Sequence, residues 1–237
     1  MQLFYNPTIS EANSSFVFDK EESKHIIKVL RKKESDILFV TNGLGLVFTT
    51  KIALASDSKC TVTILLVDKH EPLPYRLHLA VAPTKMNERY EWFLEKVTEI
   101  GIHKITPIIC EHSERKVVNI DRFQKIIESA MKQSLHSFLP KLNEPIAFKD
   151  FLKLDFNGQR FIAHCEETNK KSLKTVIQPN QDVTLLIGPE GDFSVKEIEL
   201  ALDNKFIPVT LGTTRLRTET AAIVAGHTVV LTNEISS

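Results

Sequence analysis

Two glycine-containing loops near the C-terminal end of the chain hold the residues whose types and spacing best suit ligand binding. Gly188-Pro189-Glu190-Gly191 follows the short apolar run Leu185–Ile187, and Gly212 follows a second such run, Ile207–Leu211. Short apolar runs are typical of buried parallel strands, whose carboxyl ends finish in loops that bind ligands. Spacing alone leaves two interpretations open: a binding site, or two ordinary strand–helix turns.

Neither loop has a common nucleotide-binding pattern. The first lacks both the Gly-x-Gly-x-x-Gly of dinucleotide-binding folds and the lysine of a triphosphate-binding loop. Its two glycines and its proline predict a sharp turn with exposed backbone N–H groups. Ser194 and Glu197 follow with the spacing of a capping box, so we expect a helix to begin there. A second helix, of small and apolar residues, is expected from Ala221.

The elements that must position these loops lie in residues 72–237, after a boundary marked by Pro72 and Pro74. Hydrophobic periodicity predicts, in order, a strand at 77–82, a helix at 90–100 that ends at Gly101, a strand at 104–109, a helix at 121–139, and a strand at 160–165 that leaves through Glu166-Glu167. The first three make a βαβ unit. We therefore expect an α/β domain with a mostly parallel sheet.

Residues 1–71 form a separate, mostly β region. Four segments rich in β-branched and aromatic residues predict strands at 15–18, 36–40, 46–52 and 60–67. One helix is expected from Lys20 to Lys32, and Asn42-Gly43 predicts a type I′ hairpin turn with positive φ. A few short strands with one helix suggest a small barrel-like domain.

The composition is that of a globular protein with no overall charge. Lys plus Arg and Asp plus Glu both total 30, so nucleic-acid binding would need a local basic patch or a matching shape. The three cysteines and eight histidines lack the spacing of metal ligands, so we expect no metal and a reducing compartment. We see neither a signal peptide nor an apolar run long enough for a bilayer, and expect a cytoplasmic protein with no membrane partner.

Three sequence motifs together resemble those of a known enzyme family. They are Ile187-Gly188-Pro189-Glu190-Gly191, Leu211-Gly212 and Leu216-Arg217-Thr218-Glu219-Thr220-Ala221, in this order and at the family's spacing. They resemble the bacterial small-subunit ribosomal RNA (uracil-N3)-methyltransferases, members of the trefoil-knotted SPOUT class that bind S-adenosyl-L-methionine. The resemblance implies that the two loops form the cofactor site and that the chain threads through itself there, although connections in proteins are normally unthreaded.

The resemblance extends over nearly the whole chain. It implies that the cofactor-binding residues are Ile187, Gly188, Pro189, Glu190, Gly191, Leu211, Gly212, Leu216 and Thr218. Residues 22–31 and 42–45 are similar to the family's PUA-like RNA-binding domain, with Ser35 where the family often has glycine and Asn42 where it often has aspartate. The implied partners are 16S ribosomal RNA or the small ribosomal subunit, and a second copy of the chain in a homodimer.

A basic run on the first predicted helix is the candidate RNA contact. Glu21 and Glu22 precede it, and the helix dipole alone also favours acidic residues first and basic residues last. The resemblance favours RNA binding through His25, Lys28 and Arg31. In the second domain, three further residues are candidates for contacts with RNA: Lys85 and Arg89, which could reach a phosphate, and His136, which could replace an arginine common in the family.

The implied reaction is methylation of uridine N3 in the decoding region of 16S ribosomal RNA. Only deprotonated N3 is a good nucleophile, so the site must stabilise negative charge on the uracil oxygens and hold nitrogen and methyl in line. Arg215 and Arg217 suit that task, or could grip the flanking phosphates. Glu219 begins a helix whose dipole favours the ionised carboxylate, which makes it a weak general base. We expect it to orient Arg217 or a cofactor hydroxyl. His164 should lie near the cofactor loops if the sheet is parallel, in packing rather than in catalysis.

Two other functions stay open. The chain could be a SPOUT enzyme that methylates a different RNA atom, or a non-catalytic RNA-binding assembly protein that has kept the fold. Binding of S-adenosyl-L-methionine separates an enzyme from a binding protein, and the identity of the modified nucleoside separates the two enzymes.

Overall fold

The computed structural model describes residues 2–166 and 169–235, so Glu167 of the predicted exit loop lies outside the described residues. The chain divides into two compact units. One unit comprises Met1–Pro72 with Met131–Leu139, and the other comprises Leu73–Ala130 with Pro140–Ser237.

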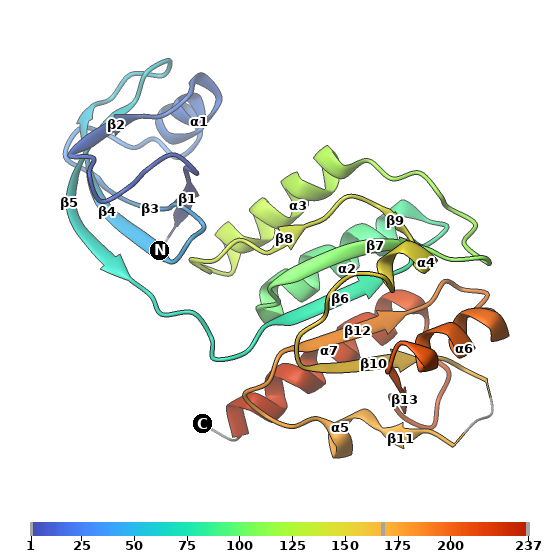
Figure 1. Cartoon of the computed structure of the whole chain (residues 1–237). Helices are drawn as coiled ribbons and strands as arrows, with labels where there is room; N and C mark the ends of the chain where they lie inside the picture. Colours follow the sequence, from blue (N-terminus) through green and yellow to red (C-terminus); the bar gives the residue numbers. More distant parts are fainter. Residues whose placement is uncertain (1, 167–168, 236–237) are drawn as a thin grey trace. The chain divides into compact units, whose positions relative to one another are not determined.

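The first unit is built on a curled, five-stranded sheet with strand order β1-β3-β4-β5-β2 (Figure 1). Its elements are β1 Leu3–Tyr5, β2 Ser15–Val17, α1 Lys20–Lys24, a π-helical turn His25–Val29, β3 Ile37–Thr41, β4 Leu46–Leu54 and β5 Thr61–Lys69. Strand β1, which the sequence analysis missed, pairs in parallel with β3, and the other pairs are antiparallel. Phe4, Ile26 and Phe48 are fully buried in the core inside the curl.

The helix predicted from Lys20 to Lys32 is shorter and changes type. Asp19 caps α1 by accepting a hydrogen bond from the Glu22 N–H at 2.7 Å, and the chain then enters the π-helical turn. Arg31 and Ser35 follow with φ of 55° and 73°, in the left-handed region that ends a helix. Glycine adopts this conformation most readily, so serine is a less favourable residue at position 35.

The hairpin between β3 and β4 forms as predicted, but its turn is not of type I′. Positive φ falls on Gly43 and Gly45 rather than on Asn42. The Asn42 side chain instead accepts hydrogen bonds from the N–H groups of Leu44 at 2.9 Å and Leu46 at 3.2 Å. The connection is therefore a longer loop closed by a side chain.

The helix predicted over 121–139 is also shorter, because its end packs within the first unit. Helix α3 spans Ile120–Gln133, and Leu135 then adopts a φ of 60°. The carbonyl of Ser137 accepts a hydrogen bond from the Gly45 N–H at 3.0 Å. The segment that holds His136 thereby joins the hairpin loop instead of continuing the helix.

The second unit contains an eight-stranded sheet with strand order β11-β13-β10-β12-β6-β7-β8, with β9 paired to β7. Every strand pair among its described residues is parallel. Besides α3, its elements are β6 Leu77–Val81, α2 Asn87–Ile100, β7 Lys104–Ile109, β8 Lys141–Leu142, β9 Ile146–Ala147, α4 Phe148–Phe151, β10 Gln159–Ala163, β11 Lys171–Ser172, α5 Leu173–Val176, β12 Val183–Ile187, α6 Val195–Asp203, β13 Ile207–Thr210 and α7 Thr218–Ile235.

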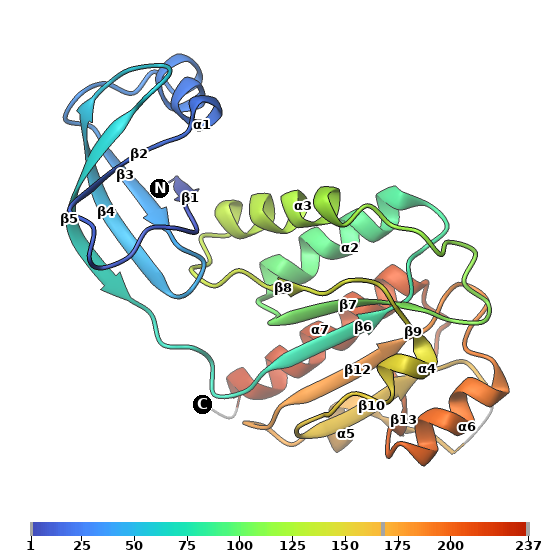
Figure 2. The ribbon, with the colours of Figure 1, turned by 45° about the horizontal axis from the view of Figure 1, so that its top comes forward.

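Helices cover both faces of this sheet, with α2 and α7 on one face and α4 and α6 on the other (Figures 1 and 2). All five residues of the central strand β12 are buried, which explains its unbroken apolar sequence. Gly101 ends α2 with a φ of 95°, as predicted. Gly226 lets α7 pack closely on β6, because a Cβ there would lie 3.4 Å from the Leu79 side chain.

The parallel sheet brings the loops after β6, β7, β10, β12 and β13 to one edge. These loops include both glycine loops identified from the sequence. The threading of the chain implied by the resemblance stays a prediction. No helix within the described residues is long and apolar enough to cross a membrane.

Candidate functional site

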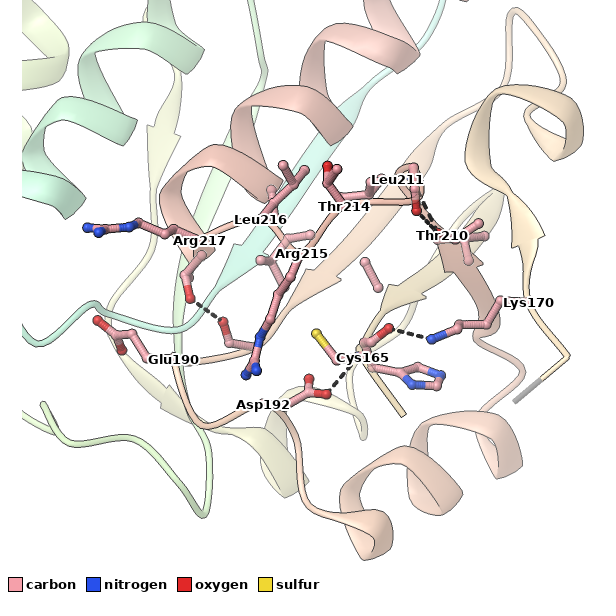
Figure 3. Close-up of a pocket in the computed structure, with 18 of the residues that line it drawn as sticks. Cys165, Lys170, Glu190, Asp192, Thr210, Leu211, Thr214, Arg215, Leu216 and Arg217 are labelled. Atoms are coloured by element: carbon pink, nitrogen blue, oxygen red, sulfur yellow. Dashed lines mark hydrogen bonds between the residues drawn. The ribbon is translucent and has the colours of Figure 1, made fainter. Parts of the chain in front are cut away.

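A cavity of about 740 Å³ lies at the carboxyl ends of β10, β12 and β13 (Figure 3). Its volume is in the range of small-molecule sites. Most of the predicted cofactor residues line it, namely Ile187, Gly188, Pro189, Glu190, Leu211, Gly212, Leu216 and Thr218. Gly191 is not among the lining residues.

Side chains connect the loops around the cavity. The Thr218 hydroxyl, at the start of α7, donates a hydrogen bond to the Gly188 carbonyl at 3.0 Å, and so joins the loop after β12 to the loop after β13. Glu190 accepts a hydrogen bond from the Lys85 N–H at 2.9 Å, which attaches the loop after β6. The loops after β6, β12 and β13 are therefore linked to one another beside the cavity.

The glycines of the two loops serve different purposes. A Cβ at Gly188 would lie 3.0 Å from the Phe193 ring, and one at Gly191 would lie 3.1 Å from the Cβ of His112. His112 Nδ1 is also 3.1 Å from the Gly191 carbonyl oxygen, so Gly191 is needed for packing against His112 rather than for lining the cavity. Gly212 has a φ of 146° and nothing within 4 Å of an added Cβ, so open space lies beside it.

The loop after β12 is anchored at its exit into α6. Asp192, with a φ of 63°, accepts a hydrogen bond from the Cys165 N–H at 2.7 Å and another from the Phe193 N–H at 2.9 Å. The capping box predicted at Ser194 and Glu197 is confirmed. Because Asp192 spans from this loop to the end of β10, the two walls of the cavity hold each other in place.

Arg215 and Arg217 both line the cavity and both are exposed. Neither has an ion-pair partner among the described residues. In Figure 3, Arg215 extends toward the loop of Glu190 and Asp192, whereas Arg217 extends away from Lys170 and Cys165. The two guanidinium groups are therefore available to an anionic substrate on different sides of the loop.

Glu219 lies in the first turn of α7, is 6% exposed and does not line the cavity. Its Oε1 is 3.8 Å from Nε of Arg89, so Arg89 occupies the place that we expected for Arg217. Its Oε2 has no hydrogen-bond partner among the described residues. Glu219 and Arg89 thus link the first turn of α7 to that of α2.

The predicted RNA contacts fall in both units. In the first unit, His25 Nδ1 is 3.1 Å from Glu22 Oε1, and Lys28 Nζ is 3.3 Å from Asp57 Oδ2. In the second unit, Lys85 Nζ is 2.8 Å from Glu114 Oε2. The pairs of Lys28 and Lys85 are exposed. Exposed ion pairs contribute little to stability, so a phosphate could replace these two carboxylates at small cost.

Further residues that were not predicted to bind the cofactor also line the cavity. His164 lines the cavity, as its parallel strand predicted, and Cys165, Lys170 and Asp192 join it. Lys170 Nζ donates hydrogen bonds to the carbonyls of His164 at 2.8 Å and Glu166 at 2.6 Å. Burial lowers the pKa of His164, and the nearby Lys170 ammonium lowers it further. No set of three or more His, Cys, Asp or Glu side chains in the described part of the chain could hold a metal ion.

Comparison with known proteins places this fold and site in one class. Residues 71–230 match the model of the RNA methyltransferase domain, and residues 18–65 match that of the RNA methyltransferase PUA domain. The chain therefore belongs to the family of RNA methyltransferases that carry a PUA domain.

The relatives are similar over nearly their full length. Ribosomal RNA small subunit methyltransferase E of Buchnera aphidicola subsp. Acyrthosiphon pisum is 32% identical over 90% of this chain and 86% of its own. The crystal structure of a probable rRNA-methyltransferase from Porphyromonas gingivalis has a TM-score of 0.93 at 37% identity and covers both chains completely. Ribosomal RNA small subunit methyltransferase E from Neisseria gonorrhoeae, whose structure is bound to S-adenosyl methionine, has a TM-score of 0.82 at 26% identity and 95% coverage of each chain.

Proposed function

We propose that this protein transfers a methyl group from S-adenosyl-L-methionine to N3 of a uridine in 16S ribosomal RNA. The observation that carries the proposal is the cavity lined by the three family motifs and closed by the hydrogen bond from Thr218 to Gly188. The relative from Buchnera is named as a small-subunit ribosomal RNA methyltransferase, and the relative from Neisseria gonorrhoeae binds S-adenosyl methionine in its structure.

The residues around the cavity fit the cofactor. Open space beside Gly212 lets a ligand approach the backbone, and both ring nitrogens of His164 are buried without a partner among the described residues. Backbone groups at Gly188, Leu211, Gly212 and Leu216 would hold the cofactor. When bound, S-adenosyl-L-methionine supplies an electrophilic sulfonium methyl group.

The two arginines of the second loop serve the nucleic-acid side of the reaction. A uracil that loses its N3 proton carries negative charge on its oxygens, and Arg217 can stabilise that charge with a planar pair of N–H donors. Arg215 can hold the uracil or a neighbouring phosphate. The carboxylates at the cavity, Glu190 and Asp192, already accept backbone hydrogen bonds, so we assign proton removal to water rather than to either of them.

The remaining RNA would lie along the basic residues outside the cavity. His25, Lys28, Arg31 and His136 are the candidates in the first unit, and Lys85 and Arg89 are the candidates in the second. The first unit coincides in part with the matched PUA domain, at residues 18–65. We place the reaction in the cytoplasm, where 16S ribosomal RNA and the small subunit are made.

Transfer of tritiated methyl groups tests the proposed reaction. Small subunits or 16S ribosomal RNA from cells that lack this protein should be labelled when protein and tritiated S-adenosyl-L-methionine are added, with the label in 3-methyluridine. Comparing free RNA with assembled subunits identifies the substrate. Label in another nucleoside would support a different RNA methyltransferase. Cofactor binding without any transfer would support a non-catalytic assembly protein.

We also propose that the protein is a homodimer formed through the second unit. The adjacent helices α2 and α7 leave Trp92 45% exposed and Leu231 43% exposed, which suits a surface covered by a second copy. Light scattering at micromolar concentration should give twice the chain's mass of 26.9 kDa. A monomer mass at that concentration would contradict the proposal.

A further inference from the structure

His164 is a buried side chain whose ring nitrogens make no hydrogen bond to the described residues. It follows β10, lines the cavity and is 8% exposed. Neither ring nitrogen has a partner among the described residues, although both are shielded from solvent. Buried polar atoms in folded proteins are nearly always hydrogen-bonded, because leaving one unpaired is destabilising. A histidine at this position therefore indicates a partner that the described residues do not provide.

We propose that His164 hydrogen-bonds to the uncharged adenosine half of S-adenosyl-L-methionine, an inference that rests on the proposed function. A neutral imidazole presents one donor and one acceptor, and adenosine offers both kinds of group on the adenine edge and the ribose hydroxyls. The amino-acid half is a poorer match. Its carboxylate is better met by a positively charged donor than by a neutral imidazole.

The charges around the ring agree with a neutral imidazole. The Lys170 ammonium is held beside it through the hydrogen bond to the His164 carbonyl at 2.8 Å. Burial is the main cause that lowers the pKa of His164, and Lys170 adds to it, while the carboxylates of Asp192 and Glu166 act in the opposite direction. Because the folded-state pKa lies below the ordinary value, the ring stays neutral at neutral pH. A neutral ring needs no charged ligand group, because it can donate one hydrogen bond and accept another.

Calorimetry with two ligands tests the assignment. One ligand is S-adenosyl-L-methionine, and the other is 5′-deoxy-5′-methylthioadenosine, which keeps the adenosine and lacks the amino acid. The substitution His164→Phe keeps an aromatic ring and removes both nitrogens. We expect both ligands to lose affinity by the same factor, about ten-fold, as for a lost hydrogen bond. A loss confined to S-adenosyl-L-methionine would place His164 at the amino-acid half and overturn the proposal.

Thermal unfolding separates a ligand contact from a packing role. The ligand-free His164→Phe protein should have an unchanged or higher Tm, because the substitution removes unpaired polar atoms. A packing role predicts a lower Tm. His78→Phe is the matched control: His78 lies in β6 of the same sheet, its Nε2 is 2.7 Å from Thr106 Oγ1, and it does not line the cavity. This control should lower the Tm and leave the affinity for both ligands unchanged.

The outcomes distinguish this inference from the proposed function. If the wild-type protein binds neither ligand, the proposed function and the inference about His164 both fail. If the wild-type protein binds and His164→Phe binds within about two-fold of it, a difference far below one hydrogen bond, only the inference fails. If His164→Phe does not fold, NMR on the wild-type protein tests the inference instead. The ring ¹⁵N resonances of His164 should shift when methylthioadenosine is added, and unchanged resonances would overturn the proposal.

Discussion

Replacing Arg217 by alanine is expected to lower the rate of methyl transfer by about 10²–10³, as the loss of one donor to a developing oxyanion does. The affinity for S-adenosyl-L-methionine should barely change, because a guanidinium is a poor partner for a sulfonium. The Tm should also be unchanged, since Arg217 is exposed and has no ion-pair partner among the described residues. Single-turnover kinetics and calorimetry on the same protein measure the two effects separately.

The competing interpretation is that Arg217 only shapes its loop through Glu219 or Glu190. It predicts that cofactor affinity and thermal stability fall together. The observed contacts disagree with this interpretation, because Glu219 lies beside Arg89 and Glu190 accepts a hydrogen bond from the Lys85 N–H.

Two further substitutions complete the test of Arg217. Arg217→Lys should restore activity only in part, because a point charge does not reproduce a planar pair of donors. Arg122→Ala removes an exposed arginine outside the cavity and should leave the rate unchanged. Full activity in Arg217→Ala would contradict the role of Arg217 in stabilising the uracil oxygens, and Arg215 would then be the candidate for that role.

Gly212→Val is expected to reduce the affinity for S-adenosyl-L-methionine by about 100-fold or more, because a disfavoured φ/ψ costs on the order of 1–3 kcal/mol and also displaces the loop. The expected effect comes from backbone strain, because Gly212 has a φ of 146°. It does not come from a steric clash, because an added Cβ would meet nothing within 4 Å. The Thr210 hydroxyl donates to the Gly212 carbonyl at 2.8 Å, so a changed φ also breaks this turn. Calorimetry measures the loss, and circular dichroism should show that the first unit stays folded.

A matched control places the same kind of strain far from the cavity. Ser35 has a φ of 73° in the first unit, and Ser35→Val puts a β-branched residue at positive φ there. It should destabilise the first unit and leave the cofactor affinity unchanged. Unchanged affinity in Gly212→Val would show that this loop does not hold the cofactor.

The second unit was predictable from the sequence because its strands are buried on both faces. Strand β12 is an unbroken apolar segment, and the capping box at Ser194 and the C-cap at Gly101 each have a local signature. Local signals of this kind survive folding because they depend on residues a few positions apart. They sufficed to place both glycine loops at the carboxyl ends of parallel strands.

What the sequence analysis missed depends on contacts between distant residues. The three-residue strand β1 exists only because β3 pairs with it, and α3 ends early because Ser137 bonds to Gly45. In the site, Gly191 packs against His112, and Glu219 lies beside Arg89. Neither pairing could be inferred from spacing, since each joins segments more than 70 residues apart.

The most direct measurement of the central claim is the nucleoside content of 16S ribosomal RNA from cells with and without this protein. Mass mapping should find 3-methyluridine at a defined position in the wild type, and unmodified uridine there in the cells that lack the protein. Expression of the wild-type protein should restore the methyl group, and Arg217→Ala should restore little of it. The same 3-methyluridine content in both cell types would contradict the assignment of this protein as the uridine N3 methyltransferase.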